Sequence, residues 1–273
     1  MNTAYHTGEH HSVPPAAADS PYYQRLRIAF SDDRVAWAVR APRVPDIPRL
    51  LEALGLTPGT PALFVTGGAG NMDEAQMERT RPAVLEGLAR FAADYGVSIV
   101  DGGTASGVMK LLGEAMSVSE DGPRFNLIGV VPIGAVCFPG YDNPDGVALD
   151  AGHTHFILAD GEKFGDESDL IARVALVLAE GSQRRPFGVV INGGDIARQE
   201  TYDRVLRQET AVPLLAFDGS GRFGDELAAA AQGAPTDDPR IAAIVQRAPV
   251  YVAPLERGPT VIYAELERLL TSG

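Results

Sequence analysis

The chain has 273 residues, and its 23 Lys and Arg against 36 Asp and Glu give a net charge of −13. This acidic balance argues against a nucleic-acid surface, which needs clustered Lys and Arg, and the single cysteine excludes a disulfide framework. We find no apolar run of the ~18–20 residues that a membrane span needs and no signal peptide pattern, so we expect a cytoplasmic, soluble protein.

The first 22 residues are polar and rich in Pro and Ala, without any periodicity, which predicts a flexible tail. No later stretch looks like a linker, so we expect residues 23–273 to form a single domain. The apolar or alternating runs 25–30 and 35–40 are separated by a polar stretch that contains Ser-Asp-Asp, and they predict a hairpin or two adjacent strands. The leucine spacing of 47–56, with Gly55 near its end, predicts a helix.

From residue 62 onward, a short apolar run that closes on glycine recurs along the chain. The runs cover 62–68, 97–103, 126–134, 155–161, 187–194 and 213–221, and all but the third precede a helical pattern, at 73–94, 106–118, 166–180, 195–209 and 224–232. A helix at 241–248, a strand at 249–254 and a helix at 260–270 follow. Near-continuous apolar strands alternating with helices indicate a parallel sheet covered on both faces. We therefore predict an α/β fold, a Rossmann-like three-layer sandwich with a mostly parallel sheet and Gly-rich loops at the carboxyl ends of the strands.

The third run is followed by a long loop instead of a helix. Residues 137–154 are rich in Gly, Pro, Asn and Asp, and long loops in compact domains tend to be functional. We expect this loop to overhang the same sheet edge as the glycine turns.

The glycine turns predict a ligand site, because open parallel sheets bind ligands outside the carboxyl ends of their strands. Glycine lets the backbone approach a ligand, and the N–H groups of a following helix favour phosphate. Arg222 offers a bidentate fork for phosphate, and Glu167 could accept ribose hydroxyls. The predicted ligand-binding residues are Gly67, Gly68, Asn71, Gly102, Gly103, Thr104, Ser106, Gly107, Glu167, Gly193, Gly194, Gly219, Ser220, Gly221 and Arg222.

Two familiar fingerprints are missing from the chain. It has no GxxxxGK[ST] and no GxSxG, which disfavours a P-loop ATPase and a serine hydrolase. The acidic pairs at helix starts, such as Asp73-Glu74, are mostly explained by capping. We predict no firm cofactor and no metal site.

His153 and His155 alternate at the start of a predicted strand, so we expect both side chains on one face. Three interpretations stay open: packing histidines, ligand contact, or metal binding with Asp160 and Asp166.

The stretch from Ala62 to Ala231 resembles the LSDAT branch of the SLOG superfamily, Rossmann-like domains related to the N-terminal region of melastatin-type TRP channels. The segments that carry the resemblance are VTGGAGN (65–71), DGGTASGVMKLLGEA (101–115), GHTHFILADG (152–161), VVINGGD (189–195) and VPLLAFDGSGRFGDEL (212–227). The resemblance implies binding of a nucleotide-derived ligand, which is ADP-ribose in some channel members. It also implies that Gly103, Thr104, Ser106 and Gly107 form the phosphate loop and that Arg222 contacts the ligand.

One departure from the family bears on the ligand. Where the channel members carry Tyr-Gly and then a basic residue, this chain has Phe164-Gly165 followed by Asp166-Glu167. The ligand therefore need not be ADP-ribose.

These observations favour a soluble sensor or binding domain for a nucleotide-derived small molecule. The alternative is an N-glycosidase, because the chain also resembles the lonely-guy-type phosphoribohydrolases, whose signature is GGxGTxxE. Residues 193–200, GGDIARQE, keep the two glycines and Glu200 but lack the Gly-Thr; in an enzyme, Glu200 or Glu167 would be catalytic. A structural scaffold is the second alternative. As partners we expect the small molecule, further copies of this chain and a separate effector protein, but no nucleic acid.

Overall fold

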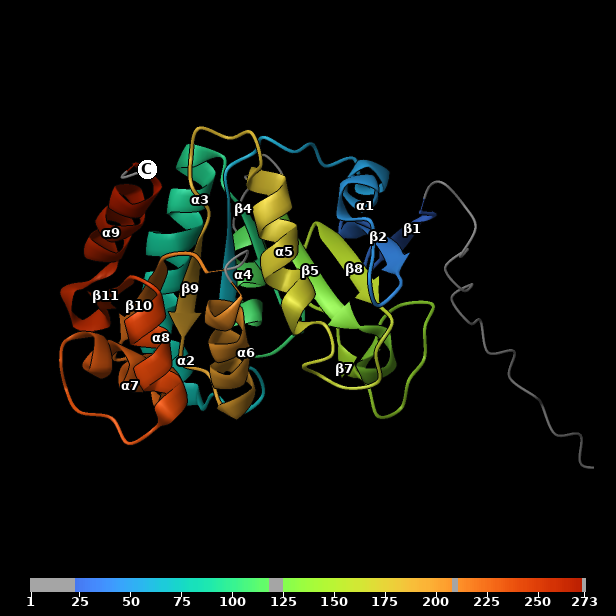
Figure 1. Ribbon diagram of the computed structural model, residues 1–273. Coiled ribbons are helices and arrows are strands. Elements are labelled where there is room, and N and C mark those ends of the chain that lie inside the picture. Colours follow the sequence, from blue (N-terminus) through green and yellow to red (C-terminus); the bar gives the residue numbers. More distant parts are fainter. Residues whose placement is uncertain (1–22, 118–124, 208–210, 272–273) are drawn as a thin grey trace, which may run out of the picture.

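The computed structural model describes residues 23–117, 125–207 and 211–271, so the predicted tail 1–22 lies outside the described residues. A nine-stranded sheet forms the centre of the molecule, in the order β1-β2-β8-β5-β4-β3-β9-β10-β11 (Figure 1). Its strands are β1 (Arg25–Ala29), β2 (Val35–Ala41), β3 (Ala62–Gly67), β4 (Ser98–Asp101), β5 (Leu127–Pro132), β8 (His155–Ala159), β9 (Phe187–Ile191), β10 (Leu214–Asp218) and β11 (Val250–Pro254). All neighbours pair in parallel except β1 and β2, which form the predicted antiparallel hairpin.

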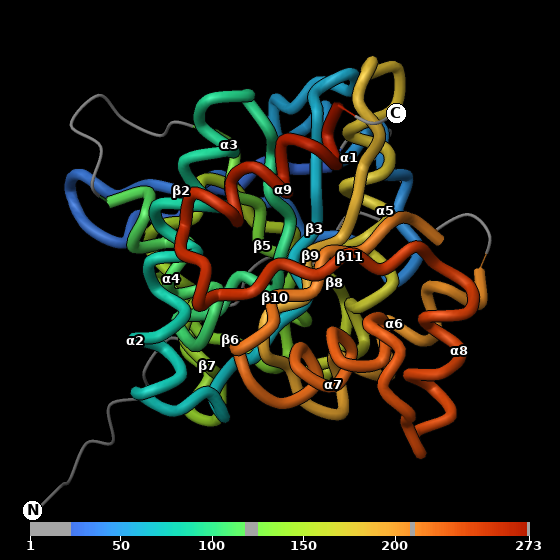
Figure 2. Tube along the Cα trace, turned by 90° about the vertical axis from the view of Figure 1, so that its left-hand side faces the viewer, coloured from blue at the N-terminus to red at the C-terminus, as the bar shows by residue number. Residues whose placement is uncertain are grey.

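Helices cover both faces of this sheet, which confirms the predicted three-layer α/β fold (Figure 2). One face carries α1 (Ile47–Leu54), α5 (Ser168–Ala179), α6 (Asp195–Leu206), α7 (Arg222–Ala231) and α8 (Pro239–Arg247). The other carries α2 (Glu74–Pro82), the π-helical segment η1 (Ala83–Ala89), α3 (Arg90–Tyr95), α4 (Gly107–Ser117) and α9 (Pro259–Thr271). None of the helices in the described ranges is long and apolar enough to cross a membrane.

Local sequence explains where several helices begin and end. At α1, Asp46 caps the first turn by accepting from the backbone N–H of Arg49 at 3.2 Å, and Gly55 ends the helix in a left-handed conformation, with φ of 78°. At α2, Asp73 and Gln76 form a reciprocal capping box. Capping therefore accounts for the acidic residue that begins this helix, as predicted.

The predicted helix 73–94 is present but contains a π-helical segment in its middle. Pro82 lies at the junction of α2 and η1, and proline lacks the N–H that a regular turn would use. Within η1, Gly87 packs so closely on α9 that a Cβ there would lie 2.9 Å from Cγ2 of Ile262. The wider turn thus lies where a proline and a close helix contact meet.

The chain reverses the direction of its connections at the centre of the sheet. From β3 it passes to β4 through α2, η1 and α3 on one face, whereas it enters β9, on the other side of β3, through α5 on the opposite face. The space between the carboxyl ends of β3 and β9 is thus a topological switch point, where α/β folds bind ligands.

The long loop 137–154 packs against the glycine loop that follows β4, as predicted. Two short strands, β6 (Val136–Cys137) and β7 (Val147–Ala148), pair within this region. The backbone N–H of Ala105 donates to the carbonyl of Ala148 at 2.8 Å, and Thr104 bridges to Leu149. The 3₁₀ turns η2 (Ile133–Ala135) and η3 (Leu255–Arg257) complete the described elements.

Candidate functional site

A cavity of about 500 Å³ opens at the switch point of the sheet. We call it the switch-point cavity. Its volume falls within the range of small-molecule sites. The predicted site residues that line it are Gly67, Asn71, Gly102, Thr104, Ser106, Glu167, Gly194, Glu200 and Arg222; other lining residues include Thr66, Met109, Phe164, Ile171 and Ile196. The structure thus gathers residues that follow five strands, β3, β4, β8, β9 and β10, into one site.

The remaining predicted residues lie outside the cavity wall: Gly68, Gly103, Gly107, Gly193, Gly219, Ser220 and Gly221. Their roles in the structure are packing and local hydrogen bonding. A Cβ at Gly107 would overlap the carbonyl oxygen of Gly68. The buried Ser220 hydroxyl accepts from Asn192 N–H at 2.7 Å and donates to the Phe217 carbonyl at 2.6 Å. These residues shape the turns that carry the lining residues.

One side of the cavity is suited to an anion. Helix α6 begins beside it at Gly194, and no side chain caps this N-terminus. Arg222, the first residue of α7, reaches the same place: a Cβ on Gly194 would lie 2.6 Å from its Nη2. None of the carboxylates that the structure describes forms an ion pair with Arg222, whereas Asp195 is held by Arg240 at 2.8 Å. A helix N-terminus and an arginine fork together favour phosphate or carboxylate.

Another part of the cavity wall carries two carboxylates in different environments. Glu167 is 6% exposed, and its Oε2 accepts from Gly165 N–H at 2.9 Å. Burial raises the pKa of Glu167 to about 7, and the nearby charge of Glu200 adds to this effect. Glu200 accepts a hydrogen bond from the Ser168 hydroxyl and lies 3.6 Å from Arg204. At neutral pH this side therefore offers one carboxyl that is partly protonated.

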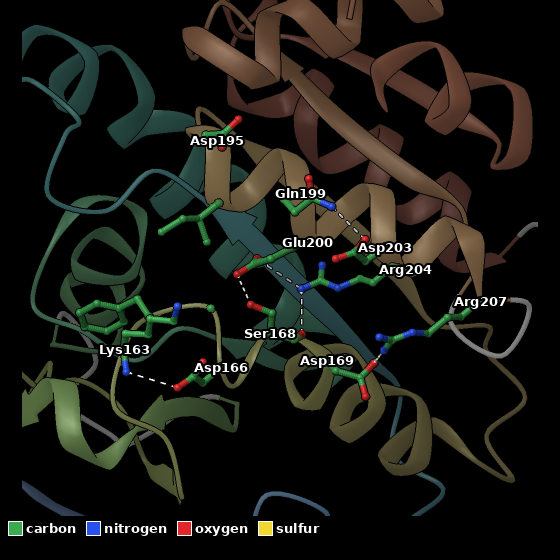
Figure 3. Close-up of a pocket in the computed structure, with 13 residues that line it drawn as sticks. Lys163, Asp166, Ser168, Asp169, Asp195, Gln199, Glu200, Asp203, Arg204 and Arg207 are labelled. Atoms are coloured by element: carbon green, nitrogen blue, oxygen red, sulfur yellow. Dashed lines mark hydrogen bonds and ion pairs between the residues drawn. The ribbon is translucent and has the colours of Figure 1, made fainter. Parts of the chain in front are cut away.

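Arg204 and Thr66 form a pair that the sequence analysis missed. Arg204 is 3% exposed and points from α6 toward Ser168 and Glu200 (Figure 3). Its Nη1 donates to Oγ1 of Thr66 at 2.5 Å, and its guanidinium lies over the Phe64 ring at 4.7 Å. Thr66 Oγ1 accepts a hydrogen bond from Arg204, so the hydroxyl proton of Thr66 is still available for donation. Within the part of the chain that the structure describes, this proton has no acceptor. Thr66 lines the cavity, so its hydroxyl is a donor for a ligand.

A second cavity of about 490 Å³ lies beside the first, and Figure 3 shows side chains that line it. The two share Phe164, Asp195, Ile196 and Glu200 in their walls. The second is lined by charges of both signs, among them Lys163, Asp166, Asp169, Asp203 and Arg207. Several of these already pair with one another, as Arg207 does with Asp169, so this cavity shows no single ligand chemistry.

The prediction that His153 and His155 share a face is wrong. The chain is still in a turn at His153, whose N–H donates to the carbonyl of Asp150 at 3.3 Å, so the period of an extended strand does not apply. The His153 ring stacks on Phe156, 5.3 Å between centroids, whereas His155 contacts the backbone of Leu54 on the face covered by α1. Within the described residues, no group of three or more His, Cys, Asp and Glu side chains could hold a metal ion.

An open, mostly parallel sheet with a cavity at its switch point places the protein among the Rossmann-like α/β proteins. Within this class, the chain belongs to the family described as "SLOG in TRPM, prokaryote", whose model matches residues 60–263. The predicted resemblance to this branch of the SLOG superfamily is thereby confirmed.

Two animal channels and one solved structure are similar to this chain. It is 28% identical over 198 residues to transient receptor potential cation channel subfamily M member-like 2 of Nematostella vectensis, covering 59% of this chain and 12% of the channel. It is also 25% identical over 239 residues to transient receptor potential cation channel subfamily M member 2 of Mus musculus. That alignment covers 76% of this chain and 15% of the channel. The chain therefore spans a small part of these channels. The X-ray structure of TM1055, a structural genomics target, has 19% identity and a TM-score of 0.48, covering 76% of this chain and 99% of that one.

Proposed function

We propose that this protein is a binding or sensor domain for a nucleotide-derived small molecule that occupies the switch-point cavity. One observation carries the proposal: the uncapped N-terminus of α6 and the guanidinium of Arg222 meet at Gly194, on one side of a cavity of ligand size. Both groups attract the phosphate of a nucleotide. Glu167 and Glu200 line the same cavity and are suited to accept hydrogen bonds from ribose hydroxyls. The chain's membership of the family described as "SLOG in TRPM, prokaryote" supports the same proposal, because the resemblance to this family implies a nucleotide-derived ligand.

Calorimetric titration with ADP-ribose, cyclic ADP-ribose, NAD and nucleoside monophosphates tests this proposal. We expect saturable binding of at least one of them, and at least tenfold weaker binding by Arg222→Gln. Arg185→Gln is the matched control, because Arg185 is exposed and lies just before β9, at the opposite end of the strand from the cavity. Absence of binding by all of these compounds at millimolar concentration would refute the proposal.

A second candidate function, hydrolysis of an N-glycosidic bond in a nucleotide, is favoured by the two carboxylates. Glu167 and Glu200 line the same cavity, and a carboxyl whose pKa burial raises, as at Glu167, is typical of a general acid. In this reaction water would add to the anomeric carbon of the ribose as the bond to the base breaks. One carboxylate would activate the water, while the other carboxyl would protonate the leaving base.

Chromatography of nucleotides and NAD after incubation with the protein separates the two functions. An enzyme would release free base, and both Glu200→Gln and Glu167→Gln would lower the rate at least a hundredfold. Binding without any release of base would leave the sensor as the function, and unimpaired cleavage by both variants would exclude these carboxylates as catalytic groups.

A further inference from the structure

His153 is buried between two carboxylates that come from separate parts of the chain. Its Nε2 lies 2.8 Å from Oδ1 of Asp101, at the end of β4, and its Nδ1 lies 3.2 Å from Oδ1 of Asp150, in the long loop. His153 is 2% exposed, Asp101 0% and Asp150 8%. Among the described residues, Asp101 and Asp150 are the charged groups that face this imidazole. We call these three residues the His153 cluster.

The cluster joins the long loop to the glycine loop 102–106, which forms one wall of the switch-point cavity. Asp101 Oδ1 also accepts from Gly103 N–H at 2.8 Å. In the other direction, Asp150 N–H donates to the Gly103 carbonyl at 3.0 Å. Gly102, Thr104 and Ser106 of this loop line the cavity. The cavity wall is therefore held by hydrogen bonds that converge on His153 and its two partners.

Tight backbone packing leaves no room for larger groups around the cluster. A Cβ at Gly113 would overlap Oδ1 of Asp150, and one at Gly152 would overlap the carbonyl oxygen of Gly113. A Cβ at Gly103 would lie 2.8 Å from Cα of Gly129. The carboxylates are thus enclosed by backbone, and small shifts in them must move the glycine loop.

The imidazole of His153 is charged at neutral pH. Burial by itself lowers the pKa of His153, but the charges and hydrogen bonds of Asp101 and Asp150 outweigh this effect and raise the pKa to about 9. In addition, Asp101 Oδ2 is buried and has no hydrogen-bond partner within the described residues. Buried ionic groups of this kind often contribute little to stability compared with apolar packing, so their position beside a ligand-binding loop suggests a different role.

We propose that His153 is a positioning residue, whose imidazolium between Asp101 and Asp150 fixes the glycine loop 102–106 in the conformation that binds ligand. This inference rests on the proposed function for its ligand, but the ordering of the loop belongs to the protein alone. The interaction requires the protonated imidazole, because both ring nitrogens must donate to carboxylates. The loop should therefore be ordered at neutral pH and loosen as the pH rises through about 9.

Amide hydrogen exchange of residues 103–106 and titration with ADP-ribose, at pH 7 and pH 10, test the inference. For His153→Gln we expect at least tenfold faster exchange in this loop and at least tenfold weaker binding at pH 7, with no further loss at pH 10. The wild-type protein should change from slow to fast exchange between the two pH values, after correction for the intrinsic rates. His155→Gln is the control: burial lowers the pKa of His155 to about 4, so it is neutral at both pH values, and we expect wild-type behaviour.

Asp150→Asn provides a second variant of nearly the same shape. Removing one carboxylate should lower the pH at which the loop loosens, because that charge helps to hold the proton on His153. A folded His153→Gln with wild-type exchange in the loop would overturn the inference. If His153→Gln fails to fold, an unchanged transition pH in Asp150→Asn would overturn it instead. A wild-type protein that binds no nucleotide refutes the proposed function, while the exchange measurements still decide the role of His153.

Discussion

Thr66 contacts the buried Arg204 through its hydroxyl and also lines the switch-point cavity. Its Oγ1 accepts from Arg204 and Thr66 lines the cavity, so the hydroxyl proton is left to be donated to a ligand oxygen. We predict that Thr66→Val weakens the binding of a nucleotide roughly tenfold, since a lost hydrogen bond costs about 1–2 kcal/mol. Thr66→Ser keeps the hydroxyl and should bind like wild type. Calorimetry on both variants checks this, and equal affinities would show that the hydroxyl does not contact the ligand.

Glu167 should make the stability of the protein fall with rising pH. Burial raises its pKa from 4.5 to about 7 in the folded state, so between these values the folded protein holds a proton that the unfolded chain has released. The stabilising effect is complete below pH 4.5 and is lost as the pH rises through about 7. Glu167→Gln stays neutral and can still accept from Gly165. We expect it to be more stable than wild type at pH 8, by about 3 kcal/mol at most, and similar to wild type near pH 4.

Urea unfolding of wild type and Glu167→Gln at pH 5 and pH 8 measures this difference. The variant should lose less free energy of unfolding than wild type between the two pH values. A larger loss in the variant would mean that Glu167 is charged and stabilised in the folded protein.

At the scale of a whole element, we predict how a substitution at the N-terminus of α6 changes nucleotide binding. Gly194→Ala places a Cβ where Nη2 of Arg222 lies, at 2.6 Å. The end of a long side chain can move aside, so the fold should persist with a change in Tm of only a few degrees. The guanidinium and the helix terminus would then no longer share one anion site, and we expect at least tenfold weaker nucleotide binding.

Gly70→Ala is the matched control for this substitution. Gly70 lines the same cavity, yet a Cβ there would meet nothing within 4 Å. Its nucleotide affinity should stay within twofold of wild type. Equal affinities for Gly194→Ala and Gly70→Ala would contradict the assignment of the anion site to α6 and Arg222.

The positions of helices and strands that show a local sequence pattern could be predicted. The buried strands read as apolar runs, and α1 was bounded by Gly55, so their positions in the structure differ from the prediction by a few residues. The π-helical segment η1 was not predicted. Pro82 at its start is visible in the sequence, but the close packing of Gly87 on Ile262 joins residues far apart in the chain and has no local signal.

The same distinction applies to the site. Gly194 and Arg222 could be named because strand-end glycines and an arginine fork are visible in the sequence. Thr66 and Arg204 are 138 positions apart, and the pairing of His153 with Asp101 joins the long loop to β4. These pairs follow from the packing of the sheet. The expectation that His153 and His155 share a face fails because a turn, rather than an extended strand, precedes β8.

At the scale of the whole molecule, the net charge of −13 and a site for an anion are compatible. Fields between exposed charges are screened beyond about 10 Å at ordinary salt, whereas α6 and Arg222 act on a ligand in direct contact. The net charge therefore bears on contacts with macromolecules, and the lining of the cavity bears on the small molecule that we propose as its ligand. That residues 23–273 form a single domain stays a prediction.

The most direct test of this account is a calorimetric comparison of nucleoside monophosphates with the matching nucleosides. Both share base and ribose, so their difference reports the phosphate alone. We predict saturable binding of at least one monophosphate, with its nucleoside at least tenfold weaker, and loss of that difference in Arg222→Gln. Equal affinities for the two compounds, or no binding by either at millimolar concentration, would contradict the central claim that this cavity binds a nucleotide through its phosphate.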